Sequence, residues 1–281
     1  MTQRKLWMVV VFLLLCICQA AQAKKKNKKY VNPERPPDGS IELFLGTSVP
    51  VTSDGAAFVG TLDVEYQWNL YFQLHFSTQM ATDPEDQVVP GNLVAGFRAG
   101  YFQPKKGWGY GIGLHMDMGL SPAELGDDKA WASDIGLYNE MSLAPFMRNS
   151  LVLAPKLALS LQLWDFVIRT WFGPEMGLPL YTDETATGIP YRGATAYGIK
   201  MGTGGGDLRG GIGFSVGFVG LADWTGEKEH TYCFDGGMGL RFTRPYFDFD
   251  FIVRIPVGGP SARIQTSILM MLSWNYYPGY L

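Results

Sequence analysis

The chain has 281 residues, with 23 Lys and Arg against 26 Asp and Glu, a formal net charge of −3, and 35 glycines. Beyond residue 23, no apolar run approaches the roughly 20 residues that a membrane-spanning helix needs, which excludes a helical membrane protein. A membrane protein built from strands stays open, because such strands alternate lipid-facing and lumen-facing side chains.

The first 23 residues read as a secretory signal peptide. Arg4 and Lys5 precede an apolar run over residues 6–18, and the small residues of "AQA" at 21–23 fit a cleavage site. The run is too short to anchor the chain across a bilayer, and neither of its cysteines follows a small residue, which disfavours a lipoprotein anchor. We expect cleavage near Ala23.

Residues 24–38, "KKKNKKYVNPERPPD", form a Lys-rich and then Pro-rich leader with little to bury, and we expect a flexible periplasmic segment. Such a basic cluster can bind anionic lipid or nucleic acid, but a short Lys run beside a cleavage site is more often a solvated tail. We expect no nucleic-acid partner. After cleavage Cys233 has no second cysteine to pair with, so it reads as a small packing residue.

From residue 40 onward the chain repeats segments of period-two alternation separated by turn residues. In "PYFDFDFIVRIP", residues 245–256, Phe247, Phe249 and Phe251 alternate with Asp248 and Asp250. Helices place their apolar residues three and four apart, whereas these spacings are two, so the segments are predicted to be strands. Twelve are expected, at residues 40–49, 57–68, 69–78, 92–103, 107–119, 135–147, 150–163, 165–174, 206–221, 231–243, 245–256 and 261–276.

The connections are mostly short on one side and long on the other, which is typical of an outer-membrane barrel with its loops pointing outward. The segment 176–206 breaks this order, because it is long yet falls on the short-turn side. Three interpretations of this segment are open: it contains two more short strands, which would make fourteen, it folds inward as a plug, or it lies in the periplasm. We expect twelve strands.

The two faces of the strands indicate a membrane barrel more than a soluble sandwich. Polar positions mix both signs of charge with small residues, as expected of a narrow lumen where opposite charges pair, while an Arg or Lys facing lipid would cost about 2–4 kcal/mol at mid-depth. We expect Asp248 and Asp250 to pair with Arg241, Arg254 or Arg263. The candidate lumen-lining charges are Asp63, Glu65, Arg98, Asp117, Glu140, Lys156, Arg169, Arg209, Asp235, Arg241, Asp248, Asp250, Arg254 and Arg263.

Glycines and aromatic residues add to this interpretation. "GWGYGIGLHMDMG" at 107–119 and "LRGGIGFSVGF" at 208–218 put glycines on one face, where a curved, closed sheet has a use for them. Trp and Tyr gather near strand ends, as in the aromatic belts of membrane interfaces: Trp68, Tyr101, Trp108, Trp164, Trp224, Trp274 and Tyr276.

Over about residues 40–277 these features resemble Gram-negative outer-membrane β-barrel proteins, and we expect the barrel domain to span residues 39–281. The resemblance implies an all-β fold, an antiparallel up-and-down transmembrane barrel, that contacts membrane lipid and is inserted by the outer-membrane assembly machinery. Members usually finish on an aromatic residue at the end of the last strand, whereas this chain has Tyr280 second to last and stops at Leu281.

Candidate catalytic residues are few. His75 and Ser77 share a strand face and resemble the His-x-Ser arrangement of outer-membrane lipid A deacylases, and His115 and Asp117 could form an acid/base pair. In each case a hydrogen-bonded lumen residue is the favoured interpretation, and no metal or cofactor is expected. The "GTGGGDLRGG" run lacks the Lys-Ser/Thr of a phosphate loop.

The function expected is a small pore or channel for polar solutes, or a structural envelope barrel. Two alternatives stay open: an outer-membrane lipid or peptide hydrolase, and an adhesin that binds through its long loops.

Overall fold

The computed structural model describes residues 38–69, 71–85, 87–105, 108–122, 124–126, 129–163, 166–180, 192–203, 211–224, 230–241, 247–259 and 264–276. The predicted signal peptide and nearly all of the leader lie outside these ranges, as do Arg209 and Arg263. Within them, no helix has the length and apolar character needed to cross a membrane.

About three quarters of the described chain is strand (76%). The elements are β1 (Ile41–Thr52), β2 (Val59–Asn69), β3 (Phe72–Thr82), β4 (Val88–Pro90), β5 (Leu93–Lys105), β6 (Trp108–Leu120), α2 (Ala130–Glu140), β7 (Ser150–Leu163), β8 (Phe166–Pro179), β9 (Arg192–Thr203), β10 (Gly211–Asp223), β11 (His230–Arg241), β12 (Phe247–Gly258) and β13 (Ile264–Tyr276).

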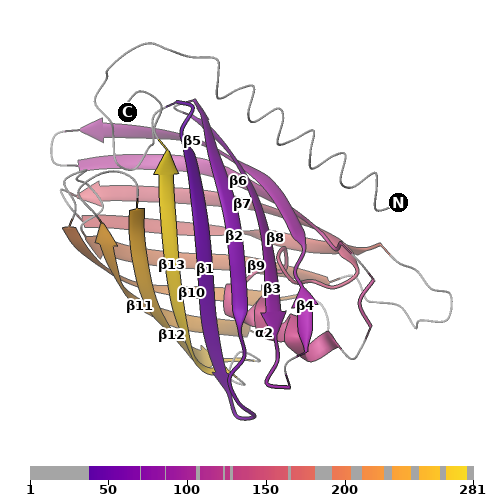
Figure 1. The fold of residues 1–281 in the computed structure, drawn as a ribbon. Helices are drawn as coiled ribbons and strands as arrows, with labels where there is room; N and C mark the ends of the chain where they lie inside the picture. Colours follow the sequence, from indigo (N-terminus) through magenta and orange to yellow (C-terminus); the bar gives the residue numbers. More distant parts are fainter. Residues whose placement is uncertain are drawn as a thin grey trace.

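Twelve of these strands close into an antiparallel barrel, which confirms the predicted fold class and strand number (Figure 1). Each strand pairs with its sequence neighbours, and β1 closes the ring by pairing with both β2 and β13, so that Leu45 stands opposite Leu62 and Leu272. The short β4 pairs only with β3 and lies outside the ring. Closure leaves the barrel wall without free edges, which a strand protein in lipid requires.

The outer face of the barrel is apolar. Large apolar side chains of one parity are exposed along every long strand, among them Leu62, Ile112, Leu114, Leu159, Phe172, Ile199, Phe214, Phe218, Ile255 and Leu272. Among the strand residues whose side chains the structure describes, every Lys and Arg has the inward parity. A cation facing lipid at mid-depth would cost about 2–4 kcal/mol, which accounts for this pattern.

The two ends of the barrel differ. At the terminal end, where Ile41 of β1 pairs with Tyr276 of β13, two residues connect β2 to β3, β5 to β6 and β7 to β8. Exposed aromatic side chains gather there: Trp68, Tyr71, Tyr101, Trp108 and Trp274. At the opposite end, here called the helix end, the chain leaves β6 and folds into the barrel as α2 before it returns in β7 (Figure 1).

The prediction of a strand over 135–147 is wrong, because α2 and the turns after it occupy this stretch. Glu140, predicted as a lumen charge on a strand, is the last residue of this helix. The helix is surrounded rather than laid on a surface: Ala132, Ser133, Ile135, Gly136, Leu137 and Asn139 are all buried. None of its residues is fully exposed, so it lacks the polar, solvent-facing side that marks an amphipathic helix.

The segment 176–206 holds one barrel strand, β9, which the sequence reading missed. The closed ring of twelve strands has no place for two more, and the inward fold of the described chain lies between β6 and β7. The rest of the segment, residues 181–191 and 204–206, lies outside the described residues. One false strand and one missed strand cancel, which is why the count of twelve is nevertheless right.

Candidate functional site in the barrel lumen

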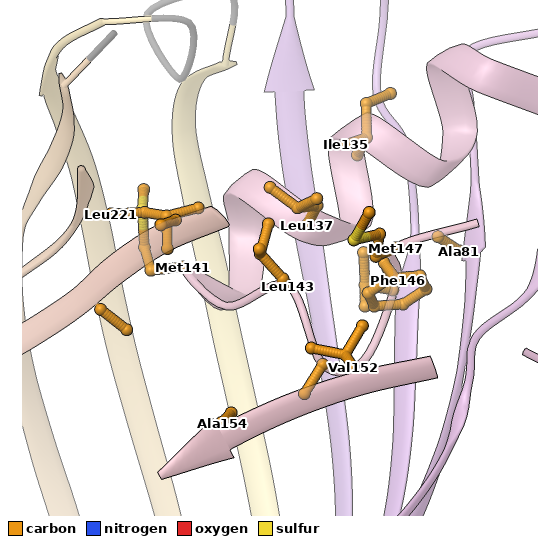
Figure 2. Packing of buried hydrophobic residues seen from close by; sticks show 14 of the residues in the cluster. Ala81, Ile135, Leu137, Met141, Leu143, Phe146, Met147, Val152, Ala154 and Leu221 are labelled. Carbon is orange, nitrogen blue, oxygen red and sulfur yellow. The ribbon is translucent and has the colours of Figure 1, made fainter. Parts of the chain in front are cut away.

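A plug, residues 129–149, fills the lumen at the helix end. Its apolar side chains pack against those of the wall in one buried cluster, and Figure 2 shows Leu143 and Phe146 beside Val152 of β7. The whole cluster comprises Ala57, Val59, Ala81, Ile135, Leu137, Met141, Leu143, Ala144, Phe146, Met147, Val152, Ala154, Ala194, Ala196, Val219, Leu221 and Cys233. Burial of this size fixes the plug chiefly through the hydrophobic effect.

Glycines in the wall let the plug come close. A Cβ on Gly119 of β6 would lie 2.1 Å from the backbone oxygen of Ala144, and one on Gly177 of β8 would lie 2.0 Å from the sulfur of Met147. Both distances are far below any contact that real Cβ atoms make. At Gly119 the neighbour is plug backbone, so the wall must carry glycine there, whereas at Gly177 it is the flexible Met147 side chain, which can change rotamer.

Hydrogen bonds hold the end of α2 to strands β1, β12 and β13. The Asn139 amide donates to Ser48 Oγ at 2.8 Å and accepts from Ser267 Oγ at 2.7 Å. The guanidinium of Arg254 donates to the Asn139 backbone oxygen, one of the carbonyls that the helix end leaves without an intrahelical partner. All four residues are buried, so these bonds are shielded from water.

Glu175 of β8 fixes the turn after α2. Its carboxylate is fully buried and accepts from Ser142 Oγ at 2.8 Å and from the backbone N–H of Leu143. Lys156 Nζ lies 2.8 Å from Glu175 Oε1 and 3.6 Å from an oxygen of Asp117. A buried carboxylate with a cation and two further donors is satisfied, and it ties plug and wall together.

Below the plug, a layer of paired charges crosses strands β2, β3, β5 and β6. His75 Nε2 lies 2.7 Å from Asp117 Oδ1, and Arg98 donates to Glu65, whose other oxygen accepts from Gln73 at 2.7 Å. A second cluster lies on β9, β11 and β12. There Arg254 holds both oxygens of Asp235, at 2.7 and 2.9 Å, and Lys200 Nζ lies 3.6 Å from one of them.

Toward the terminal end part of the inner wall is solvent-accessible, although Glu65, Gln67 and Ser273 are buried there as well. The half-buried lumen-facing residues of this part are mostly small: Phe44, Asp63, Gly111, Gly113, Ala158, Ser160, Gln162, Gly202, Ser215, Gly237 and Asp250. Arg169 is exposed on the same face. The lumen thus has a closed half, lined by the wall residues buried against the plug, and an open half, lined by the residues just named.

The structure places the described candidate charges as follows. On the strand face that points inward lie Asp63, Glu65, Arg98, Asp117, Lys156, Arg169, Asp235, Asp250 and Arg254, and Glu140 lies on α2. Arg254 takes Asp235 as its carboxylate partner rather than Asp248 or Asp250. The backbone of Arg241 stands opposite that of Asp248, while their side chains lie outside the described part.

The structure shows other partners for the two histidines than the pairs His75–Ser77 and His115–Asp117 that the sequence suggested. His75 bonds to Asp117 and not to Ser77, and its Nδ1 has no hydrogen-bond partner among the described residues, with Asp63 3.9 Å away. His115 stands in register opposite Arg98 and Lys156, beside two cations rather than against an acid. His75 therefore lies between two carboxylates, and the hydrogen bond of its Nε2 goes to Asp117 rather than to Ser77.

The sequence did not identify Glu175 and Asn139 as residues of the lumen site. Glu175 lies on the face of Arg169 and Trp171, so continuing the alternation past the predicted end of that strand would have found it. Asn139 carries no sequence signal, since its role depends on a helix inside the barrel.

No family model matches the chain, and no curated protein matches its sequence. Among solved structures, an outer membrane channel from Pseudomonas putida matches with a TM-score of 0.59 at 9% identity, over 91% of this chain and 100% of that one. The NanC porin matches with a TM-score of 0.51 at 10% identity, over 83% of this chain and 98% of that one. Two structures of outer membrane phospholipase A from Escherichia coli have TM-scores of only 0.40 and 0.42, too low to bear on function. The chain has the fold of outer-membrane β-barrel proteins.

Proposed function

We propose that this protein is an outer-membrane channel for small polar solutes, open from the terminal end and closed at the helix end by the plug. In this proposal the chain is exported by a signal peptide cut near Ala23, residues 24–38 stay in the periplasm, and residues 39–281 are inserted into lipid by the outer-membrane assembly machinery. The loops at the helix end then face outward.

The observation that carries the proposal is the change in exposure along the inner wall. On β7, Ser150, Val152 and Ala154 are fully buried, whereas Ser160 and Gln162, on the same face farther along the strand, are partly exposed. A barrel that serves only as a packed structural element has no need of a polar, accessible half. A solute pathway needs one, together with a closure that can move.

The plug is held to the wall by its buried apolar cluster and by hydrogen bonds at Asn139, at the Ser142–Leu143 turn and from the Asn92 amide to the backbone oxygens of Ala144 and Met147. We therefore expect a low basal conductance with brief openings when the plug leaves its seat, since elements that gate a channel must be able to open locally.

The test is planar-bilayer conductance of the purified protein beside a variant that cannot seat the plug, Gly119→Ala. The matched control is Gly46→Ala, because a Cβ there would meet Thr61 at 3.4 Å, an ordinary contact. We expect more frequent openings in Gly119→Ala than in wild type or Gly46→Ala. If folded Gly119→Ala barrels, verified by heat-modifiable gel mobility, carry no current, the channel proposal is wrong.

A further inference from the structure

We propose that Asp63 and His75, with the ring of Phe44 beside them, form a subsite for a hydroxyl group of an uncharged, hydroxyl-rich solute such as a sugar. This inference rests on the channel function proposed above and adds the chemical class of the solute to it. The three residues lie on the lumen face of the neighbouring strands β1, β2 and β3.

Two polar atoms face each other in this subsite without a hydrogen bond. Oδ1 of Asp63 and Nδ1 of His75 are both buried, and neither has a hydrogen-bond partner among the described residues. They lie 3.9 Å apart, which is too far for a direct hydrogen bond but close enough for one oxygen atom to bond to both. Because buried polar groups are almost always hydrogen-bonded, the pair needs a bridging group.

The His75 ring is fixed from its other side. Its Nε2 lies 2.7 Å from Asp117 Oδ1, and the ring crosses Gly96 of β5, where a Cβ would lie 2.3 Å from Nε2. Only 7% of the His75 side chain is accessible. The carboxylate of Asp117 and the missing side chain of Gly96 therefore keep Nδ1 beside Asp63.

A hydroxyl group is the bridge that suits both atoms. The ionised Asp63 carboxylate only accepts hydrogen bonds, whereas Nδ1 of His75 donates when the ring is charged and accepts when it is neutral. A hydroxyl both donates and accepts, so it can bond to Asp63 and to either form of His75. An ammonium group has no acceptor for the charged ring, and an anion has no donor for Asp63.

The neighbouring aromatic ring favours a solute over a bridging water. Phe44 of β1 stands opposite Asp63 in the register, faces the lumen and is half-buried, in a part of the wall where most side chains are small. Ligand sites combine apolar and aromatic surface with a few polar groups that fix the orientation. Such a combination matches the apolar face and the hydroxyl edge of a sugar ring.

A solute can reach the subsite from the open half of the lumen. The side chain of Asp63 is 22% accessible. Ser77 stands opposite Asp63 on β3, and Gln79, on the same face, has a buried Oε1 without a hydrogen-bond partner in the described part of the chain. These two side chains are the groups that we expect to bind further hydroxyls of the same solute.

The experiment is a glucose titration of the purified, detergent-solubilised protein, followed by saturation-transfer NMR. We expect the wild type to bind glucose in the millimolar range. Asp63→Asn should bind at least about tenfold more weakly, because it loses a hydrogen bond to a charged acceptor. Phe44→Leu keeps an apolar side chain but loses the ring, and it should bind about threefold more weakly.

The matched control is Ser160→Ala, on the lumen face of β7, which should bind glucose like the wild type. Heat-modifiable gel mobility verifies that each variant is folded, and Phe44→Leu still tests the subsite if Asp63→Asn does not fold. Lack of glucose binding by the wild type would mean that only water bridges the pair, and it would overturn the subsite.

Two further results would also overturn it. Binding that is unchanged in both Asp63→Asn and Phe44→Leu would place the sugar elsewhere. Binding of glucosamine more than about tenfold tighter than that of glucose would show that an ammonium group, rather than a hydroxyl, is recognised. Since the titration needs no current, a protein that binds glucose in this way but never conducts in planar bilayers would refute the channel alone.

Discussion

The closed and open halves of the lumen share the same strands, the same parity and the same apolar outer face, yet they differ in what fills them. Val59 and Cys233 are buried against the plug, while Gly113 and Ser215 face accessible space. Period-two alternation therefore distinguishes the lipid-facing residues of a strand from its lumen-facing residues. It does not indicate whether the lumen-facing residues contact water or another part of the chain.

The halves also differ in how their charges are held. In the closed half Glu175 and Arg254 lie between plug and wall, shielded from water, whereas in the open half Arg169 is exposed. Removing one partner of a buried pair is strongly destabilising, and an exposed charge contributes little. Substitutions in the two halves should therefore have unequal effects.

The largest effect is expected for Arg254→Ala. It leaves Asp235 buried with only the more distant Lys200 and frees the Asn139 carbonyl, so the free energy of unfolding should fall by about 3–5 kcal/mol. Urea unfolding in lipid vesicles, followed by tryptophan fluorescence, measures it. Arg169→Ala is the open-half control, expected within about 0.5 kcal/mol of wild type. Equal losses in both variants would remove the distinction between the halves.

Glu175→Gln should come next. The amide keeps the size of the side chain but loses the charge that Lys156 and the plug donors face, for a loss of roughly 1.5–3 kcal/mol in unfolding free energy. The control is Glu124→Gln at an exposed position. Hydrogen exchange of the Leu143 amide should increase only in the Glu175 variant, and protection that stays at the wild-type level would argue against this anchor.

Gly119→Ala should cost about 1–3 kcal/mol, since the new methyl group overlaps the Ala144 oxygen and the plug must shift. Gly46→Ala in the open half should be close to neutral. Trypsin cleavage at Arg148 reports on plug seating: we expect faster cleavage in Gly119→Ala, and no difference between the two variants would contradict the close fit.

The smallest effect is expected for Glu140→Gln. Burial raises the pKa of the Glu140 carboxyl, against the opposing influence of the Arg254 cation. Because the folded state holds this proton more tightly, the stability it contributes is present below the ordinary glutamate pKa and is lost as pH rises through the raised value. Glu140→Gln should abolish that slope, with a change below about 1 kcal/mol. Melting temperatures across this pH range would show it, and a steeper slope in the variant would contradict it.

The barrel could be predicted from the sequence because a charged side chain that faces lipid is destabilising, so the strands keep a regular alternation. Phe251 stands in register with the exposed Met238 on the outer face, as the sequence indicated. The strand β9 was not predicted from the sequence because its lumen-facing residues include Ala194, Ala196 and Gly198, which differ little in polarity from the residues that face outward. Close packing requires them to be small, since a Cβ on Gly198 would lie 2.2 Å from the Trp171 ring.

The plug could not be predicted by the same means. A helix inside a barrel is contacted on all sides, so polar Ser133 and Asn139 are buried among apolar residues and the helical period is blurred. The ion pairs were predictable as a class but not as partners. Pairing depends on register across strands far apart in sequence, as with His75 and Asp117.

The central claim, that one half of the lumen is closed and the other accessible to water, is tested most directly by cysteine reactivity. Single cysteines at Ser160 and Ser215 report on the open half, and cysteines at Ser48 and Ser267 on the closed half, each in a Cys233→Ala background. With a charged methanethiosulfonate reagent on the folded barrel, we expect the open-half cysteines to react at least roughly tenfold faster, because reaction in the closed half requires local opening of the plug. Equal rates in the two halves would contradict the account.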